Sequence, residues 1–161
     1  MKLENTKAVA DCKESDYAAI FLAGGQGATT TFHNNVALEK LFAQFLEKGK
    51  VASTVCHGGV LLLTAKDSHG QLLCHGKAWT SFTDDEERIV EKMAGGKQQS
   101  LWIESEARKI PGTIWMGSEA FEQYAIRDKN LVTGQNQNSA IFAASLVVEA
   151  LRKARVKLFT H

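Results

Sequence analysis

Two short apolar runs that each end at a pair of glycines constrain the fold of this chain most strongly. The first is YAAIFLAGG, residues 17–25, and the second is KVASTVCHGG, residues 50–59. Short, continuous apolar runs bounded by turns are typical of buried parallel strands. Residues 34–49, NNVALEKLFAQFLEKG, lie between them and carry apolar side chains at helical spacing. Strands that alternate with helices predict an α/β fold with a largely parallel sheet.

The rest of the chain continues this alternation. Residues 83–93, TDDEERIVEKM, carry acids in the first turn and Thr83 as a helix cap. Residues 138–157 have a broad apolar face, which predicts a last helix. The remaining pattern predicts a short helix over 58–66, a strand over 77–83, a helix over 100–110, an extended segment over 120–128 and a turn with a strand over 129–136.

Composition places the chain among ordinary globular proteins and argues against several kinds of partner. Its 161 residues, 44% of them hydrophobic, suit a single domain over residues 1–161. The formal net charge of +1 gives no reason to expect nucleic acid or a membrane as a partner, and no apolar run is long enough to span a bilayer. The three cysteines lack the spacing of a disulfide framework, so we expect a cytoplasmic protein.

Cys56 lies where the second apolar run meets Gly58 and Gly59. A cysteine on a sharp turn between a strand and a helix has the arrangement of a nucleophile elbow, and the start of a helix favours the thiolate. The backbone N–H of His57 would face a developing oxyanion, and Gly25 would supply a second donor if the two strands are neighbours. The alternative is that Cys56 is a small, buried hydrophobic residue.

His57 is a candidate base for Cys56 if its ring swings beside the sulfur. It would then need an orienting carboxylate on its far nitrogen. Residues 84–87, DDEE, offer four acids at the start of a predicted helix, and periodicity alone does not choose among them. A solvated helix start, favoured by the helix dipole, explains the same four acids without a site.

The remaining glycine and cysteine motifs do not have the spacing of a cofactor or metal site. The turn AGGQG supplies a wall at Gly24 and Gln26, but it lacks the spacing of a nucleotide-binding loop, so we expect no cofactor. His33 follows this turn and is a candidate for the pocket lining or a surface histidine. A second pair, Cys74 and His75, lacks the chelate spacing of zinc sites, so we expect no metal.

Four motifs, in this order along the chain, resemble the ThiJ/PfpI superfamily, also called type 1 glutamine amidotransferase-like: DYAAIFLAGGQG, VASTVCHGGVLLL, GKAWTSFTDDEE and LVTGQNQNSA. The branch of heat-shock chaperones and glyoxalase III-type proteins is the most similar. This resemblance implies a flavodoxin-like three-layer sandwich. It also implies Cys56 as the nucleophile, His57 as its adjacent histidine and Glu87 as the third member of a triad, with Gly25 and the His57 amide as oxyanion donors.

Two features depart from the pattern of this family. Gln26 stands where family members carry a histidine. Family members also hold a strand, a helix and a second strand ahead of residues 17–25, so the resemblance implies an N-terminally shortened sheet. A glutamate on the first of those turns serves as general acid and base in the family's glyoxalase reaction, and neither Glu4 nor Glu14 matches it. A sheet without its first strand exposes edges, so we expect a homo-oligomer, a dimer.

The resemblance implies a reactive-cysteine protein that acts on small carbonyl compounds, as glyoxalase III and deglycase enzymes do. Cys56 would attack the electrophilic carbon of a small-molecule carbonyl substrate, and His57 would move protons. Two alternatives stay open. One is a stress-response chaperone or redox sensor in which Cys56 is oxidised. The other is a degenerate, truncated member of the family without turnover.

Overall fold

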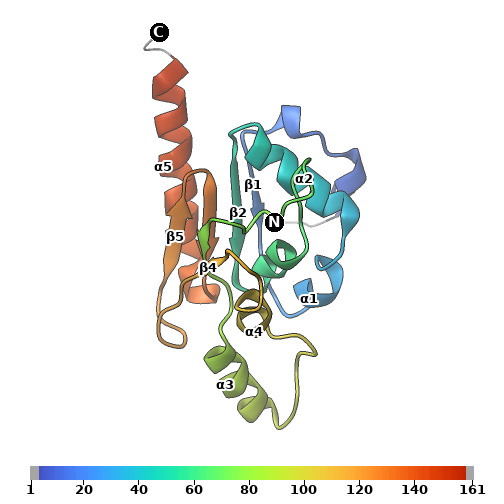
Figure 1. Ribbon diagram of the computed structural model, residues 1–161, viewed down its shortest axis with the longest axis vertical. Helices are drawn as coiled ribbons and strands as arrows, with labels where there is room; N and C mark the ends of the chain where they lie inside the picture. The colour runs from blue at the N-terminus through green and yellow to red at the C-terminus, as the bar shows by residue number, and fades with distance from the viewer. Residues whose placement is uncertain (1–3, 159–161) are drawn as a thin grey trace.

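A computed structural model describes residues 4–158, with side chains to residue 154. Its main sheet has four strands in the order β1 (Ala19–Leu22), β2 (Val51–Val55), β6 (Leu131–Gly134) and β5 (Ala125–Asp128) (Figure 1). β1, β2 and β6 are parallel, and β5 pairs antiparallel with β6. The α/β fold with a largely parallel sheet is therefore confirmed.

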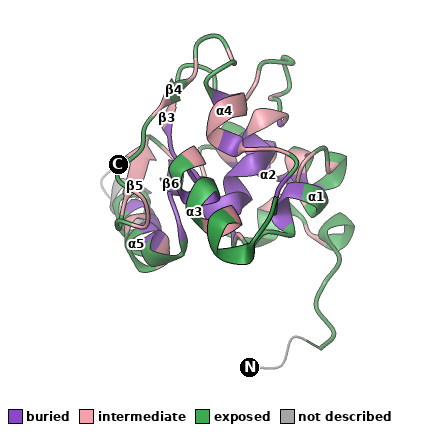
Figure 2. Cartoon of the chain, turned by 90° about the horizontal axis from the view of Figure 1, so that it is seen from below, coloured by how far each residue is buried: buried purple, intermediate pink, exposed green. Residues whose placement is uncertain are grey.

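Helices cover both faces of this sheet and make three layers. The last helix, α5 (Ala140–Leu158), lies on one face, where Val51, Val132 and Ala143 belong to one apolar cluster. On the other face, α2 (Val36–Glu47) packs with the rest of the larger cluster. Figure 2 shows that the buried residues concentrate between these layers.

Helix α2 illustrates how local sequence and packing agree. The side chain of Asn35 accepts a hydrogen bond from the backbone N–H of Leu38, which caps the helix start. Leu38, Phe42 and Phe45 recur at helical spacing and are buried against the sheet. Gly49 follows the helix end with φ of 72°, a left-handed conformation that glycine adopts without strain. The predicted helix over 34–49 is thus confirmed.

The strand predicted over 77–83 is wrong in length. Only β3 (Ala78–Trp79) is a strand, and it pairs in a separate two-stranded sheet with β4 (Ile114–Trp115), which the sequence pattern did not predict. After Trp79, the Thr80 N–H donates to the side-chain oxygen of Thr133 on β6 and not to a backbone carbonyl. The hydroxyls of Ser81 and Thr83 then donate to the carbonyl oxygen of Cys56 and to the Glu86 carboxylate, and the strand ends at Trp79.

Several other elements differ from their predicted bounds. The helix predicted over 58–66 is a 3₁₀ helix, η3 (Cys56–Leu63), that begins at the cysteine itself. The helix predicted over 100–110 shortens to α4 (Ile103–Ala107). The helix predicted after Thr83 is α3 (Asp84–Ala94). A short helix after the first glycine turn, α1 (Ala28–Thr31), was not predicted. Single-turn 3₁₀ helices are η1 (Val9–Asp11), η2 (Glu14–Asp16) and η4 (Gln137–Ser139).

Strand β1 lies at an edge of the main sheet. Phe21 on this strand keeps 38% of its surface exposed, although it belongs to an apolar run. The termini of the predicted domain, residues 1–3 and 159–161, lie outside the described residues. Within the described residues, none of the helices combines the length and the apolar character needed to cross a membrane.

Candidate active site

Cys56 occupies the turn between β2 and η3, at the carboxyl end of a central strand. Its φ of 56° is left-handed, a conformation that costs a non-glycine residue energy and that persists where surrounding contacts enforce it. The Ser81 hydroxyl donates a hydrogen bond of 2.6 Å to the carbonyl oxygen of Cys56. A residue distant in sequence, Ser81, therefore stabilises the conformation of this turn.

Glycines let the turn after β1 lie directly against this elbow. A Cβ on Gly24 would lie 2.5 Å from the carbonyl oxygen of Val55 and 2.8 Å from Cβ of Cys56. A Cβ on Gly58 would lie 2.7 Å from the carbonyl oxygen of Leu22. These distances are shorter than real Cβ contacts, so both positions need the absence of a side chain.

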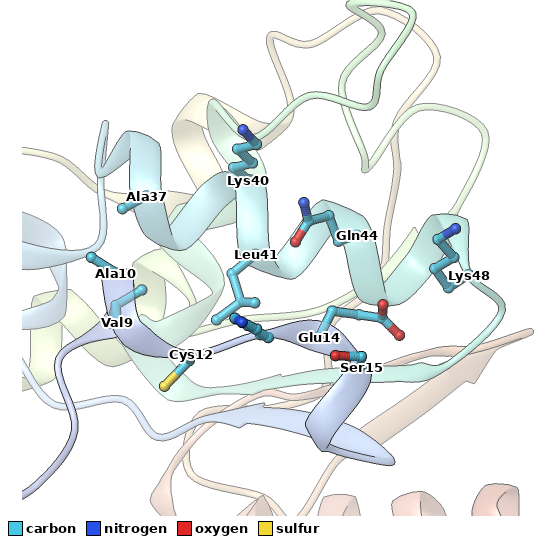
Figure 3. A pocket seen from close by; sticks show the side chains of 11 residues that line it. Val9, Ala10, Cys12, Glu14, Ser15, Ala37, Lys40, Leu41, Gln44 and Lys48 are labelled. Carbon is cyan, nitrogen blue, oxygen red and sulfur yellow. The ribbon is translucent and has the colours of Figure 1, made fainter.

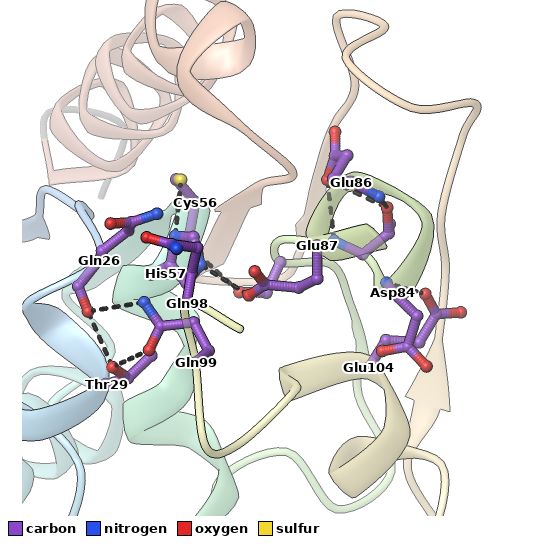
Figure 4. Close-up of polar contacts among 12 residues, drawn as sticks. Gln26, Thr29, Cys56, His57, Asp84, Glu86, Glu87, Gln98, Gln99 and Glu104 are labelled. Atoms are coloured by element: carbon purple, nitrogen blue, oxygen red, sulfur yellow. Dashed lines mark hydrogen bonds and ion pairs between the residues drawn. The ribbon is translucent and has the colours of Figure 1, made fainter. Parts of the chain in front are cut away.

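The side chains of Cys56, His57 and Glu87 form one line of contacts (Figure 4). Sγ of Cys56 lies 3.3 Å from Nδ1 of His57, and Nε2 of the same ring lies 2.8 Å from Oε1 of Glu87. His57 is 3% exposed and Glu87 fully buried, so water screens this pair weakly. The ring of Phe82 stacks on the imidazole at 4.3 Å between centroids and fixes its plane.

The environment of His57 favours the protonated imidazolium. Burial alone would lower its pKa, but the hydrogen bonds to Cys56 and to Glu87 outweigh burial and raise the pKa from 6.5 to about 9. The ring then carries an N–H on both nitrogens, one toward the sulfur and one toward the carboxylate. At neutral pH the site therefore holds a proton next to the sulfur.

The four acids at the start of α3 have four different environments. Asp84 accepts hydrogen bonds from a serine of α4, and Asp85 is exposed to solvent. Glu86 and Glu87 are both fully buried. Of these four carboxylates, Glu87 is the one that hydrogen-bonds His57.

Glu86 ties three parts of the chain together behind the site. Its Oε1 accepts hydrogen bonds from the backbone N–H of Phe121 and from the side-chain amides of Gln135 and Asn136, at 2.7–3.0 Å. Its Oε2 accepts from the backbone N–H and the hydroxyl of Thr83, the helix cap. This carboxylate is thus fully satisfied, and it joins α3 to the loop of Phe121 and to the end of β6.

A cavity of about 470 Å³ opens onto Cys56 and His57. The glycine turn borders it through Gly24, Gly25 and Gln26. His33 is not among its lining residues; it is half-buried, and its Nδ1 lies 3.4 Å from the Asn34 amide. The sequence interpretation did not single out the other lining residues, which are Val55, Phe82, Val90, Phe121, Gln137 and Ala140.

The position of Gln26 depends on a residue that sequence reasoning also missed. Gln99 is buried, its amide nitrogen donates to the Gln26 carbonyl at 3.3 Å, and its amide oxygen accepts from Thr29 at 2.6 Å (Figure 4). Gln99 lies in a polar stretch that looks like an ordinary loop. Only the fold brings it to the glycine turn.

The other two cysteines lie elsewhere. Cys12 borders a groove of about 460 Å³ between the N-terminal segment and α2, which is shown in Figure 3 with Lys40 and Lys48 on its helical side. Cys74 is fully buried, and burial raises the pKa of its thiol. All three cysteines are free thiols. No group of three or more candidate metal ligands occurs within the described residues.

A strained cysteine on an elbow at the carboxyl end of a central parallel strand, next to a buried histidine and glutamate, defines a class of α/β proteins with a candidate catalytic cysteine. Residues 1–150 match the model of the DJ-1/PfpI family. The chain belongs to this family, and the resemblance inferred from its motifs is confirmed.

Similar proteins include several named as glyoxalases. A protein of Schizosaccharomyces pombe, described as a probable glutathione-independent glyoxalase, is 31% identical over 92% of this chain and 68% of its own length. The crystal structure of glyoxalase III from Candida albicans superposes with a TM-score of 0.76 at 30% identity, over 88% of this chain and 60% of that one. The rapid encystment protein of Francisella tularensis gives a TM-score of 0.82 at 27% identity, over 90% of this chain and 63% of that one. The chain thus spans about two thirds of the length of these relatives.

Proposed function

We propose that this protein converts 2-oxoaldehydes to 2-hydroxycarboxylates, with Cys56 as nucleophile, His57 as acid and base and Glu87 as the group that orients the imidazole. The observation that carries the proposal is the continuous contact from the Cys56 sulfur through the His57 ring to the buried Glu87 carboxylate. Relatives named glutathione-independent glyoxalases support the reaction type.

In the first step, the Cys56 sulfur forms a bond to the aldehyde carbon of the substrate. The electron pair of the C=O bond moves to its oxygen, which takes the proton that His57 holds, and a hemithioacetal results. The stacked and buried position of His57 supports this role, because the ring is held within reach of the sulfur.

In the next step, neutral His57 removes the hydrogen of the former aldehyde carbon as a proton and returns it to the neighbouring carbon, while the proton of the hemithioacetal hydroxyl passes to the former ketone oxygen. The product of this step is the thioester of a 2-hydroxy acid. Water then attacks the thioester carbon, the C–S bond breaks, and the 2-hydroxycarboxylate leaves the Cys56 thiolate. The net reaction consumes one water and needs no external oxidant or reductant.

The backbone N–H groups of Gly25 and His57 are our candidates for the oxyanion hole. The close approach of the glycine turn to the elbow supports this assignment, because a Cβ on Gly24 would lie 2.9 Å from the His57 nitrogen. Donors at that place would stabilise negative charge on the substrate oxygen.

The test is conversion of methylglyoxal to lactate by the wild type and by Cys56→Ala, with Cys74→Ala as the matched control. We expect Cys56→Ala to lose turnover, because no other thiol borders the cavity, and Cys74→Ala to keep it if the protein stays folded. Equal rates for wild type and Cys56→Ala would overturn the proposal.

A second candidate function is redox sensing by the same cysteine. Cys56 borders an open cavity beside a protonated ring, whereas Cys74 is fully buried and apart from the cavity. Attack of the Cys56 thiolate on hydrogen peroxide would break the O–O bond and yield a sulfenate and water. Mass spectrometry after mild peroxide treatment should find the modification selectively on Cys56; equal oxidation of Cys12 and Cys74 would exclude this function.

We further propose that residues 1–161 form one domain that acts as a cytoplasmic homodimer. Three free thiols support a reducing compartment. Exposed apolar side chains on the β1 edge and on α5, among them Phe21, Ile141 and Val148, support self-association. Light scattering coupled to size-exclusion chromatography should give twice the 17.6 kDa of one chain, and a monomer mass at micromolar concentration would contradict the dimer.

A further inference from the structure

Apolar side chains make up much of the lining of the cavity above Cys56. Val55, Phe82, Val90, Phe121 and Ala140 form this wall. They come from β2, the loop before α3, α3 itself, the loop before β5 and the start of α5. Five apolar side chains from five segments make a wall that no single local motif provides.

Phe121 is a fixed part of this wall. Its φ of 62° is left-handed, although it is not glycine. Its N–H donates to Oε1 of the buried Glu86 at 2.8 Å, and its carbonyl accepts from the Asn138 amide at 2.8 Å. Its ring makes an edge contact with Phe82, with 6.0 Å between the ring centroids. Hydrogen bonds to both the N–H and the carbonyl of Phe121 maintain this strained backbone conformation. The position of the Phe121 ring in the cavity wall is therefore fixed by the surrounding structure.

Charge is absent from the wall. Among the described residues that line the cavity, none is lysine, arginine, aspartate or glutamate. The one cationic group is His57, whose two ring nitrogens already face Cys56 and Glu87. A negatively charged substituent against this wall would lose water without meeting a free cationic side chain, because the polar side chains that the lining offers besides Cys56 and His57 are the uncharged amides of Gln26 and Gln137.

We propose that the cavity selects uncharged 2-oxoaldehydes whose second substituent is apolar and as large as an aromatic ring, with Phe121 and Val90 as the residues that determine this specificity. This inference rests on the proposed function of Cys56. The aldehyde carbon would lie at the sulfur, and the substituent would lie against Phe121 and Val90. A cavity of about 470 Å³ is within the range of small-molecule sites, and a methyl group alone would leave most of the apolar wall uncovered.

The first experiment compares kcat/KM for methylglyoxal, phenylglyoxal and 4-carboxyphenylglyoxal. Phenylglyoxal should exceed methylglyoxal by about tenfold or more, because extra buried carbons contribute about that much per group in an apolar pocket. 4-Carboxyphenylglyoxal has the same ring and one negative charge, and it should fall below phenylglyoxal by about tenfold or more. Equal values for the two aromatic substrates, or no advantage of phenylglyoxal over methylglyoxal, would overturn the inference.

Two variants with matched controls locate the specificity. Val90→Lys should raise the ratio of kcat/KM for 4-carboxyphenylglyoxal to kcat/KM for phenylglyoxal. Ile89→Lys is the control and should leave this ratio unchanged, because it places the same charge on the adjacent residue, which is exposed and outside the cavity. Phe121→Ala should lower the ratio of phenylglyoxal to methylglyoxal, and Phe121→Leu should restore part of it. Phe142→Ala, an exposed phenylalanine of α5 outside the cavity, should leave that ratio unchanged. If a ratio shifts equally in a variant and in its control, Phe121 and Val90 do not determine the specificity.

A second measurement does not depend on turnover. Alkylation of Cys56, in which the sulfur displaces iodide from carbon, is followed with iodoacetamide, iodoacetate and N-phenyl iodoacetamide, and each rate is divided by the rate with glutathione. We expect a normalised rate that is highest for the phenyl reagent and lowest for anionic iodoacetate. If Cys56-dependent turnover is absent but this order holds, the proposed reaction fails and the selectivity of the cavity stands. If turnover occurs and this order is missing, the inference fails and the proposed function stands.

Discussion

The Glu87 carboxylate lies 2.8 Å from Nε2 of His57, and both side chains are almost completely buried. The residue before it, Glu86, does not contact the imidazole but accepts a hydrogen bond from the backbone N–H of Phe121. Of these two adjacent glutamates, Glu87 therefore binds the imidazole and Glu86 supports the cavity wall. Substitutions of the two residues should have different effects.

Glu87→Gln keeps the shape of the side chain and an oxygen that accepts from His57, but it removes the charge. We expect kcat to fall roughly a hundredfold, since an imidazolium without its carboxylate forms less readily. Steady-state kinetics with a 2-oxoaldehyde measure the change. Asp85→Asn removes an exposed acid from the same helix turn and should leave kcat unchanged; a similar loss in both variants would contradict the special place of Glu87.

His57 should titrate far above an ordinary histidine. Its pKa is raised from 6.5 to about 9, so its protonated form stabilises the folded protein. That contribution is complete below pH 6.5 and is lost as the pH rises through about 9. NMR titration of the ring should show a midpoint near 9, and Glu87→Gln should move the midpoint downward. A midpoint at or below 6.5 in the wild type would mean that the contacts with Cys56 and Glu87 do not raise the pKa of His57.

Glu86→Gln should destabilise the fold. The carboxylate accepts hydrogen bonds from five donor groups, and an amide in its place would turn an N–H₂ toward some of them. Leaving buried donors unpaired costs about 1–3 kcal/mol in the free energy of unfolding. Urea denaturation measures this cost. Asp85→Asn again serves as control, with a change within about 0.5 kcal/mol; equal stabilities of all three proteins would show that the network is not needed.

Gly24→Ala should disturb the elbow from the neighbouring strand. Its Cβ would lie 2.5 Å from the Val55 carbonyl oxygen and 2.8 Å from Cβ of Cys56, so backbone must move, at about 1–3 kcal/mol in unfolding free energy. Alkylation of Cys56 should also change its rate. Gly27→Ala is the matched control, because nothing lies within 4 Å of a Cβ there and its φ is −61°. Unchanged stability and alkylation in Gly24→Ala would mean that the turn and the elbow are not in close contact.

Local patterns predicted a large part of the fold. The apolar runs before the two glycine turns and the periodic spacing in α2 predicted strands and a helix that the structure confirms. Patterns failed where tertiary partners decide. β3 is only two residues long, since the backbone N–H of the next residue, Thr80, donates to the side chain of Thr133 rather than to a backbone carbonyl, and α4 spans only Ile103–Ala107.

The candidate site divides in the same way. The sequence of Cys56, His57 and the following glycines predicted a turn with a thiol, because the turn depends on small residues next to one another in the chain. The acids at 84–87 stayed equivalent on periodicity alone, and only the resemblance favoured Glu87 among them. The rotation of α3 against the elbow decides which carboxylate reaches the imidazole.

By itself, the sequence determined an α/β alternation, a family and a cysteine on a glycine-flanked turn, because each of these depends on neighbouring residues. The tertiary structure decided which further side chains surround that cysteine and how the cavity beside it is lined. Phe121 and Gln99 come from segments without a recognisable motif, and Val90 comes from a predicted helix whose orientation the sequence left open; all three reach the cavity or its border only through the packing of distant elements. Burial and long-range hydrogen bonds, which place an imidazolium beside a thiol, arise only once the chain has folded.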